Sequence, residues 1–154
     1  MVTDYYPDPV ADTKMIQIIL RYFPGSIYFF PQGSRDEEYL NSLNIFHENK
    51  ERITVLQHSV EALNEVIAHE EINYVGTRLH GGTKCLQDGV DSVIIAVDNR
   101  AAEIGKDIGL PIVPRTELNL VVDWLEGRHM FPPIKLPKEA IQQWKGQFRK
   151  AIVA

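Results

Sequence analysis

The fold is decided by the stretch Tyr74-Val75-Gly76-Thr77-Arg78-Leu79-His80-Gly81-Gly82-Thr83. Its first residues continue an apolar run from Ile72, and a short run of this kind predicts a buried strand over 72–77. The residues that follow predict a helix beginning near His80, where Gly81-Gly82 removes the side chains. A strand that passes directly into a helix is the repeating unit of an α/β fold.

The same alternation continues on both sides of this stretch. Further strands are predicted at 26–30, 53–56, 92–97 and 112–113. Helices are predicted from Pro9 up to Pro24, after Ser34, after Ser59, around 101–108, on Leu118, Val121, Val122 and Leu125, and on Ile141, Trp144, Phe148 and Ile152. The strands are almost wholly apolar, which is typical of a parallel sheet with helices on both faces. We therefore expect one α/β domain over residues 1–154, closed by helices in 116–154.

Several side chains receive a structural interpretation. Asp8 before Pro9 predicts a capped helix start, and Ser34 with Glu37 has the spacing of a capping box. The charged stretch 47–52 is expected to form a solvated loop. Core or packing roles are expected for Cys85, Trp124 and Trp144.

Composition excludes several classes of protein. With 16 basic and 21 acidic residues the net charge is −5, which argues against nucleic-acid binding. The single cysteine, Cys85, cannot form an internal disulfide. No metal-ligand or P-loop motif occurs, so we expect no metal site. The apolar run 93–97 is too short to span a membrane and residues 1–9 lack a signal pattern, so a cytoplasmic protein is expected.

Ligands of parallel α/β sheets bind at the carboxyl ends of the strands, which here are the loops 31–34, 57–59, 77–83 and 98–100. In the third loop, Arg78 follows a strand and Gly81-Gly82 exposes backbone N–H groups at a helix start, so an anionic ligand is predicted. Thr77, at the end of the same strand, is also predicted to bind the substrate. The alternative is that Arg78 pairs with a carboxylate of this chain and that the glycines only allow close packing of the helix on the sheet.

The neighbouring loops add weaker candidates. His80, apart from His58, is the one clear proton donor in these loops. Arg100 can bring a second positive charge to the same crevice, or can pair with Asp98 or Glu103 at the surface. Gln32 and Ser59 are the two remaining candidates for substrate binding. The alternative is a structural role for each, in a turn or in helix capping.

Taken together, these motifs resemble the second half of the polysaccharide pyruvyl transferases over about residues 5 to 115. The resemblance rests on Gly76-Thr77-Arg78-Leu79-His80-Gly81, on Ile94-Ile95-Ala96-Val97-Asp98-Asn99-Arg100, and on the upstream order Asp8-Pro9-x-x-Asp12, Pro31-Gln32-Gly33, Asp36-x-x-Tyr39-Leu40 and Gln57-x-Ser59.

The resemblance implies the C-terminal, Rossmann-like domain of a two-domain enzyme of the GT-B type. It implies transfer of a pyruvyl group from phosphoenolpyruvate to two hydroxyls of a sugar, as a ketal, in exopolysaccharide, capsule or cell-wall polymer synthesis. Arg78 and His80 would hold the donor, with His80 as general acid, and Arg100 stands where the family has a lysine. No cofactor is implied. The first domain, which would supply much of the acceptor site, is absent, so this chain is expected to bind the donor weakly without turnover.

Two other functions remain open. The same helix start could hold the diphosphate of a nucleotide sugar, as in the donor half of a GT-B glycosyltransferase, although no clear acidic ribose-binding residue follows the motif. A non-enzymatic α/β binding module, such as a receiver-like domain, would need acidic residues at the strand ends. Only Asp98 is acidic among Gln57, Thr77, Arg78 and Asp98.

Overall fold

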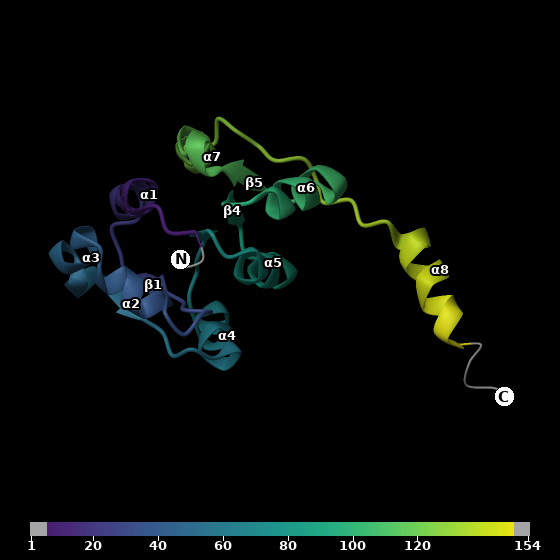
Figure 1. The fold of residues 1–154 in the computed structure, drawn as a ribbon, viewed down its shortest axis with the longest axis horizontal. Coiled ribbons are helices and arrows are strands. Elements are labelled where there is room, and N and C mark those ends of the chain that lie inside the picture. Colours follow the sequence, from purple (N-terminus) through teal and green to yellow (C-terminus); the bar gives the residue numbers. More distant parts are fainter. Residues whose placement is uncertain (1–5, 150–154) are drawn as a thin grey trace.

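The computed structural model describes residues 6–149, and within them the chain is an α/β protein (Figure 1). Its strands are β1 Ile27–Phe29, β2 Ile53–Val55, β3 Tyr74–Gly76, β4 Ser92–Ala96 and β5 Ile112–Pro114. Its helices are α1 Pro9–Tyr22, α2 Asp36–Asn41, α3 Asn44–Glu48, α4 Val60–His69, α5 Leu79–Gln87, α6 Asn99–Ile108, α7 Asn119–Leu125 and α8 Lys138–Arg149. Short 3-10 turns occupy Lys50–Arg52 and Arg115–Glu117.

All the strand pairs in the described part of the chain are parallel, as predicted. β1 pairs with β2, and β3-β4-β5 form a second ladder in which Gly76 lies opposite Ile94 and Ile94 lies opposite Ile112. The expected sheet is thus divided between β1 and β3, where a cavity of about 150 Å³ lies between Tyr28 and Val75. Strands this short form few ladder hydrogen bonds, and one apolar core shared by both ladders holds them together.

Helices cover both faces of the strands, which confirms the predicted layers. α1, α3 and α7 lie on one side and α4, α5 and α6 on the other (Figure 1). The centre of the core is β4, whose Val93, Ile94 and Ile95 are at most 1% exposed. This arrangement is consistent with a Rossmann-like domain, and it directs the carboxyl ends of β3, β4 and β5 to one edge.

Two of the three predicted caps are confirmed. The Asp8 carboxylate accepts from the N–H of Ala11 at 3.0 Å, and the Ser59 hydroxyl accepts from the N–H of Ala62 at 3.2 Å. The capping box of Ser34 is wrong, because α2 begins at Asp36 and its N-cap is Arg35, without a side-chain cap.

The charged stretch 47–52 is not a simple loop. His47 lies in α3, and Lys50–Arg52 form a 3-10 turn that leads into β2. The Arg52 guanidinium is half-buried and donates to the carbonyls of Leu20 and Phe23 at the end of α1. The prediction failed because these charges satisfy carbonyls left open at a helix end.

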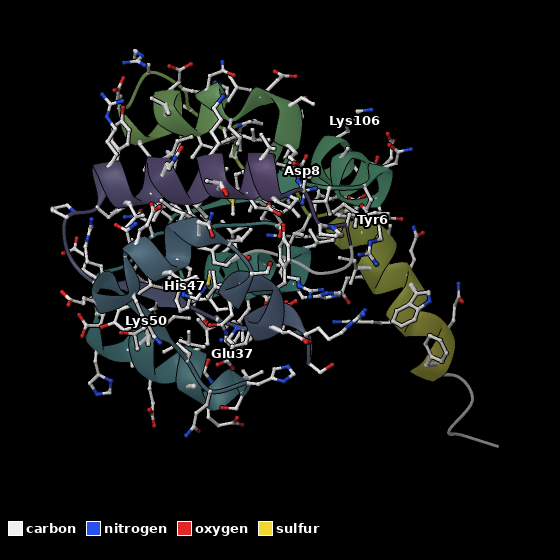
Figure 2. The ribbon with its side chains drawn as sticks, turned by 60° about the vertical axis from the view of Figure 1, so that its left-hand side comes forward. Tyr6, Asp8, Glu37, His47, Lys50 and Lys106 are labelled. Atoms are coloured by element: carbon white, nitrogen blue, oxygen red, sulfur yellow. The ribbon has the colours of Figure 1, made fainter. Side chains whose placement is uncertain are left out.

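The two tryptophans differ. Trp124 of α7 packs against the core, as predicted, and Leu118 and Val121 beside it are buried. Trp144 of α8 was expected to pack but is 59% exposed and contacts the equally exposed Phe148 at a ring distance of 4.8 Å. The reason is that α8 extends away from the body of the molecule (Figures 1 and 2). Ile152, predicted on the same helix, lies outside the described residues.

Candidate functional site

Three arginines follow the three strands of one ladder. Arg78 comes after β3, Arg100 lies in the first turn of α6 after β4, and Arg115 comes directly after β5. Because these strands are adjacent and parallel, the three residues follow the same edge of the sheet. Each forms an ion pair with an aspartate, and those partners are Asp36, Asp98 and Asp12 respectively.

The pair of Arg78 and Asp36 is largely buried. Asp36 is fully buried at the start of α2, and Arg78 donates to its carboxylate. The same carboxylate accepts from the backbone N–H groups of Gln32 at 2.9 Å and Gly33 at 2.8 Å. Burial alone would raise the pKa of Asp36, but the hydrogen bonds from Arg78, Gln32 and Gly33 lower it below its usual value. The carboxylate therefore remains charged and fixes the guanidinium.

Gly33 leaves room for this pair. A Cβ at this position would lie 2.7 Å from an Arg78 nitrogen and 3.1 Å from an Asp36 oxygen. The loop of Pro31, Gln32 and Gly33 thus serves the ion pair through its backbone. Gln32, predicted to bind substrate, contributes its N–H group to Asp36.

The start of α5 combines the two interpretations of the sequence. The Arg78 carbonyl accepts from the N–H of Gly82 at 3.1 Å and from the buried Tyr74 hydroxyl at 2.9 Å. A Cβ on Gly82 would lie 2.3 Å from the Ile94 side chain, so this glycine is needed for close packing. The structural alternatives, a carboxylate partner for Arg78 and tight packing at Gly82, are therefore both correct.

The same helix start nevertheless presents groups for a ligand. The N–H groups of Leu79, His80 and Gly81 precede the first hydrogen bond of the helix, and such groups attract anions. His80 is exposed at the second position of α5, where its imidazole is open to solvent. Thr77, also predicted to bind substrate, is only 5% exposed. The edge thus offers a fixed guanidinium, a helix start and an accessible imidazole.

Arg100 is the most open of the three arginines. Its side chain is 65% exposed and lies 3.9 Å from Asp98, which caps α6 by accepting from the N–H of Ala101 at 3.1 Å. The pairing with Asp98 that the sequence allowed is present but long. Ser59, in contrast, follows β2 in the other ladder, and its hydroxyl caps α4.

A buried cluster around Asp12 was not predicted as part of the site. Asp12 is 1% exposed in the first turn of α1. It accepts from the Tyr39 hydroxyl at 2.7 Å and lies 3.5 Å from Arg115, which also donates to the Tyr6 carbonyl at 2.7 Å. Tyr6 and Asp8 lie at the N-terminal end of α1 (Figure 2). The available signal was the Asp36-x-x-Tyr39 spacing, which places both residues on one side of a helix.

Burial sets the titration of this cluster. It raises the pKa of Asp12 above its usual value, although the hydrogen bond from Tyr39 and the charge of Arg115 act in the opposite direction. Burial, together with the hydrogen bond to Asp12, also raises the pKa of Tyr39. Since Asp36 and Tyr39 both belong to α2, this one helix is tied to Arg78 through the first residue and to the Arg115 cluster through the second.

The described residues contain no group of three or more His, Cys, Asp or Glu side chains arranged to hold a metal ion. Cys85 is fully buried, and burial raises the pKa of its thiol to about 11, so the predicted core role is confirmed. Within residues 6–149, no helix is both long enough and apolar enough to cross a membrane.

Searches with this chain found no match among protein-family models, curated proteins or solved structures.

Proposed function

We propose that this chain is the donor-binding domain of a polysaccharide pyruvyl transferase with a GT-B-like, two-domain arrangement. One observation carries the proposal. The in-register pairing of β3 and β4 brings the Arg78-Leu79-His80 and Asp98-Asn99-Arg100 motifs to the same edge, each at the start of a helix. These are the two motifs on which the resemblance chiefly rests, and phosphoenolpyruvate carries two anionic groups that such an edge suits.

The pairing of Arg78 with Asp36 fits this role. A guanidinium held by a buried carboxylate loses little side-chain entropy when a ligand arrives. Arg78 retains 22% exposure of its side chain, so its positive charge can be approached by a phosphate or carboxylate at the edge. Arg100, which is mostly exposed, adds a second and more adaptable cation.

The reaction then follows from these groups. Protonated His80 gives its proton to the methylene carbon of phosphoenolpyruvate, which leaves positive charge on the neighbouring carbon. A sugar hydroxyl attacks that carbon, and the carbon–oxygen bond to phosphate breaks with its electron pair on the departing phosphate. Arg78 and the N–H groups of α5 stabilise this phosphate. A second hydroxyl attacks the same carbon and closes the ketal; of the two hydroxyl protons released, one returns to His80 and the other goes to the phosphate.

A titration of the isolated chain with phosphoenolpyruvate, followed by backbone amide NMR, tests donor binding. We expect millimolar affinity and shifts confined to 77–83 and 98–100. Arg78→Lys should weaken binding about tenfold, because lysine keeps the charge without the bidentate geometry. Arg21→Lys, in the last turn of α1 and outside the proposed site, is the control and should not change donor binding. Absence of shifts at millimolar donor, or shifts with a nucleoside diphosphate instead, would exclude the proposal and favour the nucleotide-sugar alternative.

The role of His80 separates binding from chemistry. His80→Gln should leave the donor affinity within twofold, since Arg78 and the N–H groups of α5 are proposed to supply most of the donor contacts and the exposed ring chiefly the proton. The catalytic role is measured in a two-domain protein, in which the facing domain implied by the resemblance is joined to this chain. There the His80→Gln variant should release phosphate at least a hundredfold more slowly than the unmodified protein in the presence of a sugar acceptor. His69→Gln, an exposed histidine in the last turn of α4, should change neither quantity.

A further inference from the structure

A groove of about 700 Å³ lies beside the edge strand β5, a volume within the range of about 300–1,000 Å³ that is typical of ligand sites. It begins at Asp98 and Asn99, at the loop that carries Arg100, and continues along β5 between α6 and the segment that follows α7. This segment crosses back to α6 before the chain reaches α8 (Figure 1). The groove therefore opens from the proposed donor edge.

The walls of the groove are held by backbone contacts. The N–H of Lys135 donates to the Ile108 carbonyl at 2.8 Å, which fixes the returning segment to the end of α6. Gly109 has φ +74°, and a Cβ there would lie 3.2 Å from the Pro133 carbonyl oxygen. On the other wall, Gly105 lets α6 lie close to Ile112 of β5. A Cβ at position 105 would lie 3.1 Å from the Ile112 side chain. These contacts fix the backbone on both sides of the groove.

The groove lining combines planar polar groups with an aromatic ring. Its residues include Asp98, Asn99, Arg115, Thr116, His129 and Phe131. The rings of His129 and Phe131 contact edge to face at 4.7 Å, and both side chains are half-buried. Asn99 and Thr116 are exposed and can exchange hydrogen bonds with a ligand. Donors and acceptors beside an aromatic face suit the hydroxyls and C–H faces of a sugar.

Charge distinguishes this groove from the anion-binding edge beside it, which carries Arg78 and Arg100. Its two cations are both matched by carboxylates, Arg115 by Asp12 and Lys106 by Glu103 at 2.9 Å. Lys106 lies on the outer surface of α6 (Figure 2). Asp98 contributes a negative charge that Arg100 offsets from a distance. A groove without a free excess of positive charge favours a neutral, hydroxylated ligand over a phosphate.

We propose that this groove binds the acceptor glycan, a neutral sugar chain, with its reacting end at Asp98 and Asn99. The inference rests on the proposed function, because it places the acceptor next to the donor site. A groove of about 700 Å³ has room for more than one sugar unit, so oligosaccharides bind more tightly than monosaccharides. Asn99 and Phe131 are the binding residues that matter most, the first by hydrogen bonding and the second by stacking.

Backbone amide NMR of the intact chain tests the groove. The probes are methyl glycosides of glucose, galactose, mannose and N-acetylglucosamine, with the corresponding di- and trisaccharides. At least one series should shift the amides of 98–106, 115–116 and 129–131, with affinity rising from one to three units. Asn99→Ala should weaken binding about fivefold. Asn119→Ala is the matched control, because Asn119 is also an exposed first residue of a helix.

The outcomes separate this inference from the proposed function. Sugar shifts in the groove with no response to phosphoenolpyruvate uphold the groove and reject the donor site. Shifts with phosphoenolpyruvate at 77–83, while all the sugars fail or bind elsewhere, overturn the inference alone. A nucleoside diphosphate that occupies the groove also overturns it. Phe131→Ala can loosen the fold, so Phe131→Leu, which keeps an apolar side chain, is measured beside it. If Phe131 stacks on the sugar, both variants should bind it more weakly while their helical content stays unchanged.

Discussion

At the scale of single residues, Arg78 has a proposed binding role and a structural role, and removing its side chain affects both. It is the proposed anion clamp, and it neutralises a fully buried carboxylate. Arg78→Ala should lower the free energy of unfolding by about 3–5 kcal/mol, because Asp36 would then remain buried as an uncompensated charge. Urea denaturation measures this loss. In the double variant Asp36→Asn, Arg78→Ala the loss should be smaller, and equal losses in both proteins would contradict the structural role of the pair.

The two buried aspartates should respond to pH in opposite directions. The pKa of Asp36 lies below its ordinary 3.8 in the folded protein, so its stabilisation is present above that value and is lost as pH falls through the folded pKa. The pKa of Asp12 lies above 3.8, so its contribution is complete below 3.8 and is lost as pH rises through the folded pKa.

This contrast gives a test by urea denaturation between about pH 3 and pH 6. The stability lost in Asp36→Asn should shrink as the pH falls, because the unmodified protein loses the same contribution. The stability lost in Asp12→Asn should grow as the pH falls, because the unmodified protein is relieved of a buried charge. Parallel slopes for the two variants would refute the assigned pKa directions.

At the scale of elements, the packing of α5 on the sheet depends on one missing methyl group. Gly82→Ala would place a Cβ 2.3 Å from Ile94 Cγ1 and 2.9 Å from the Tyr74 ring, and neither side chain can move freely in the core. We expect a loss of about 1–3 kcal/mol in the free energy of unfolding. The site should suffer as well, since Arg78 and His80 belong to the same helix start.

Gly146 provides the matched control for this prediction. It also lies inside a helix, α8, but has nothing within 4 Å of a would-be Cβ. Gly146→Ala should therefore leave the free energy of unfolding unchanged to within about 0.5 kcal/mol. Thermal unfolding of both variants decides the matter. A stable Gly82→Ala protein would mean that α5 does not pack as described.

At the scale of the whole molecule, α8 stands apart from the domain. None of its residues belongs to the described core, and its Trp144 and Phe148 are exposed. A chain that ends at Pro137 should retain its melting temperature to within about 2 °C. It should also bind phosphoenolpyruvate with unchanged affinity. By contrast, Leu118→Ala, at the start of α7, should cost about 2–5 kcal/mol, because this side chain is 3% exposed. A large drop on truncation would show that α8 packs on the body.

Local chemistry made much of the fold predictable from the sequence. The apolar runs at 27–29, 53–55, 74–76 and 92–96 fix the strands, and Asp8 and Ser59 fix two helix starts, because each signal acts within a few residues. The parallel order followed from their alternation with helices. The same signals located the edge that carries Arg78, His80 and Arg100.

What the sequence did not determine depends on contacts between distant segments. Only the folded chain pairs Arg78 with Asp36 and assembles Asp12, Tyr39 and Arg115 from α1, α2 and the end of β5. It also divides the sheet between β1 and β3, and it leaves Trp144 in solvent because α8 extends away from the body of the molecule. The physical reason is that burial and ion pairing depend on which surfaces meet in space, and periodicity along the chain does not record this.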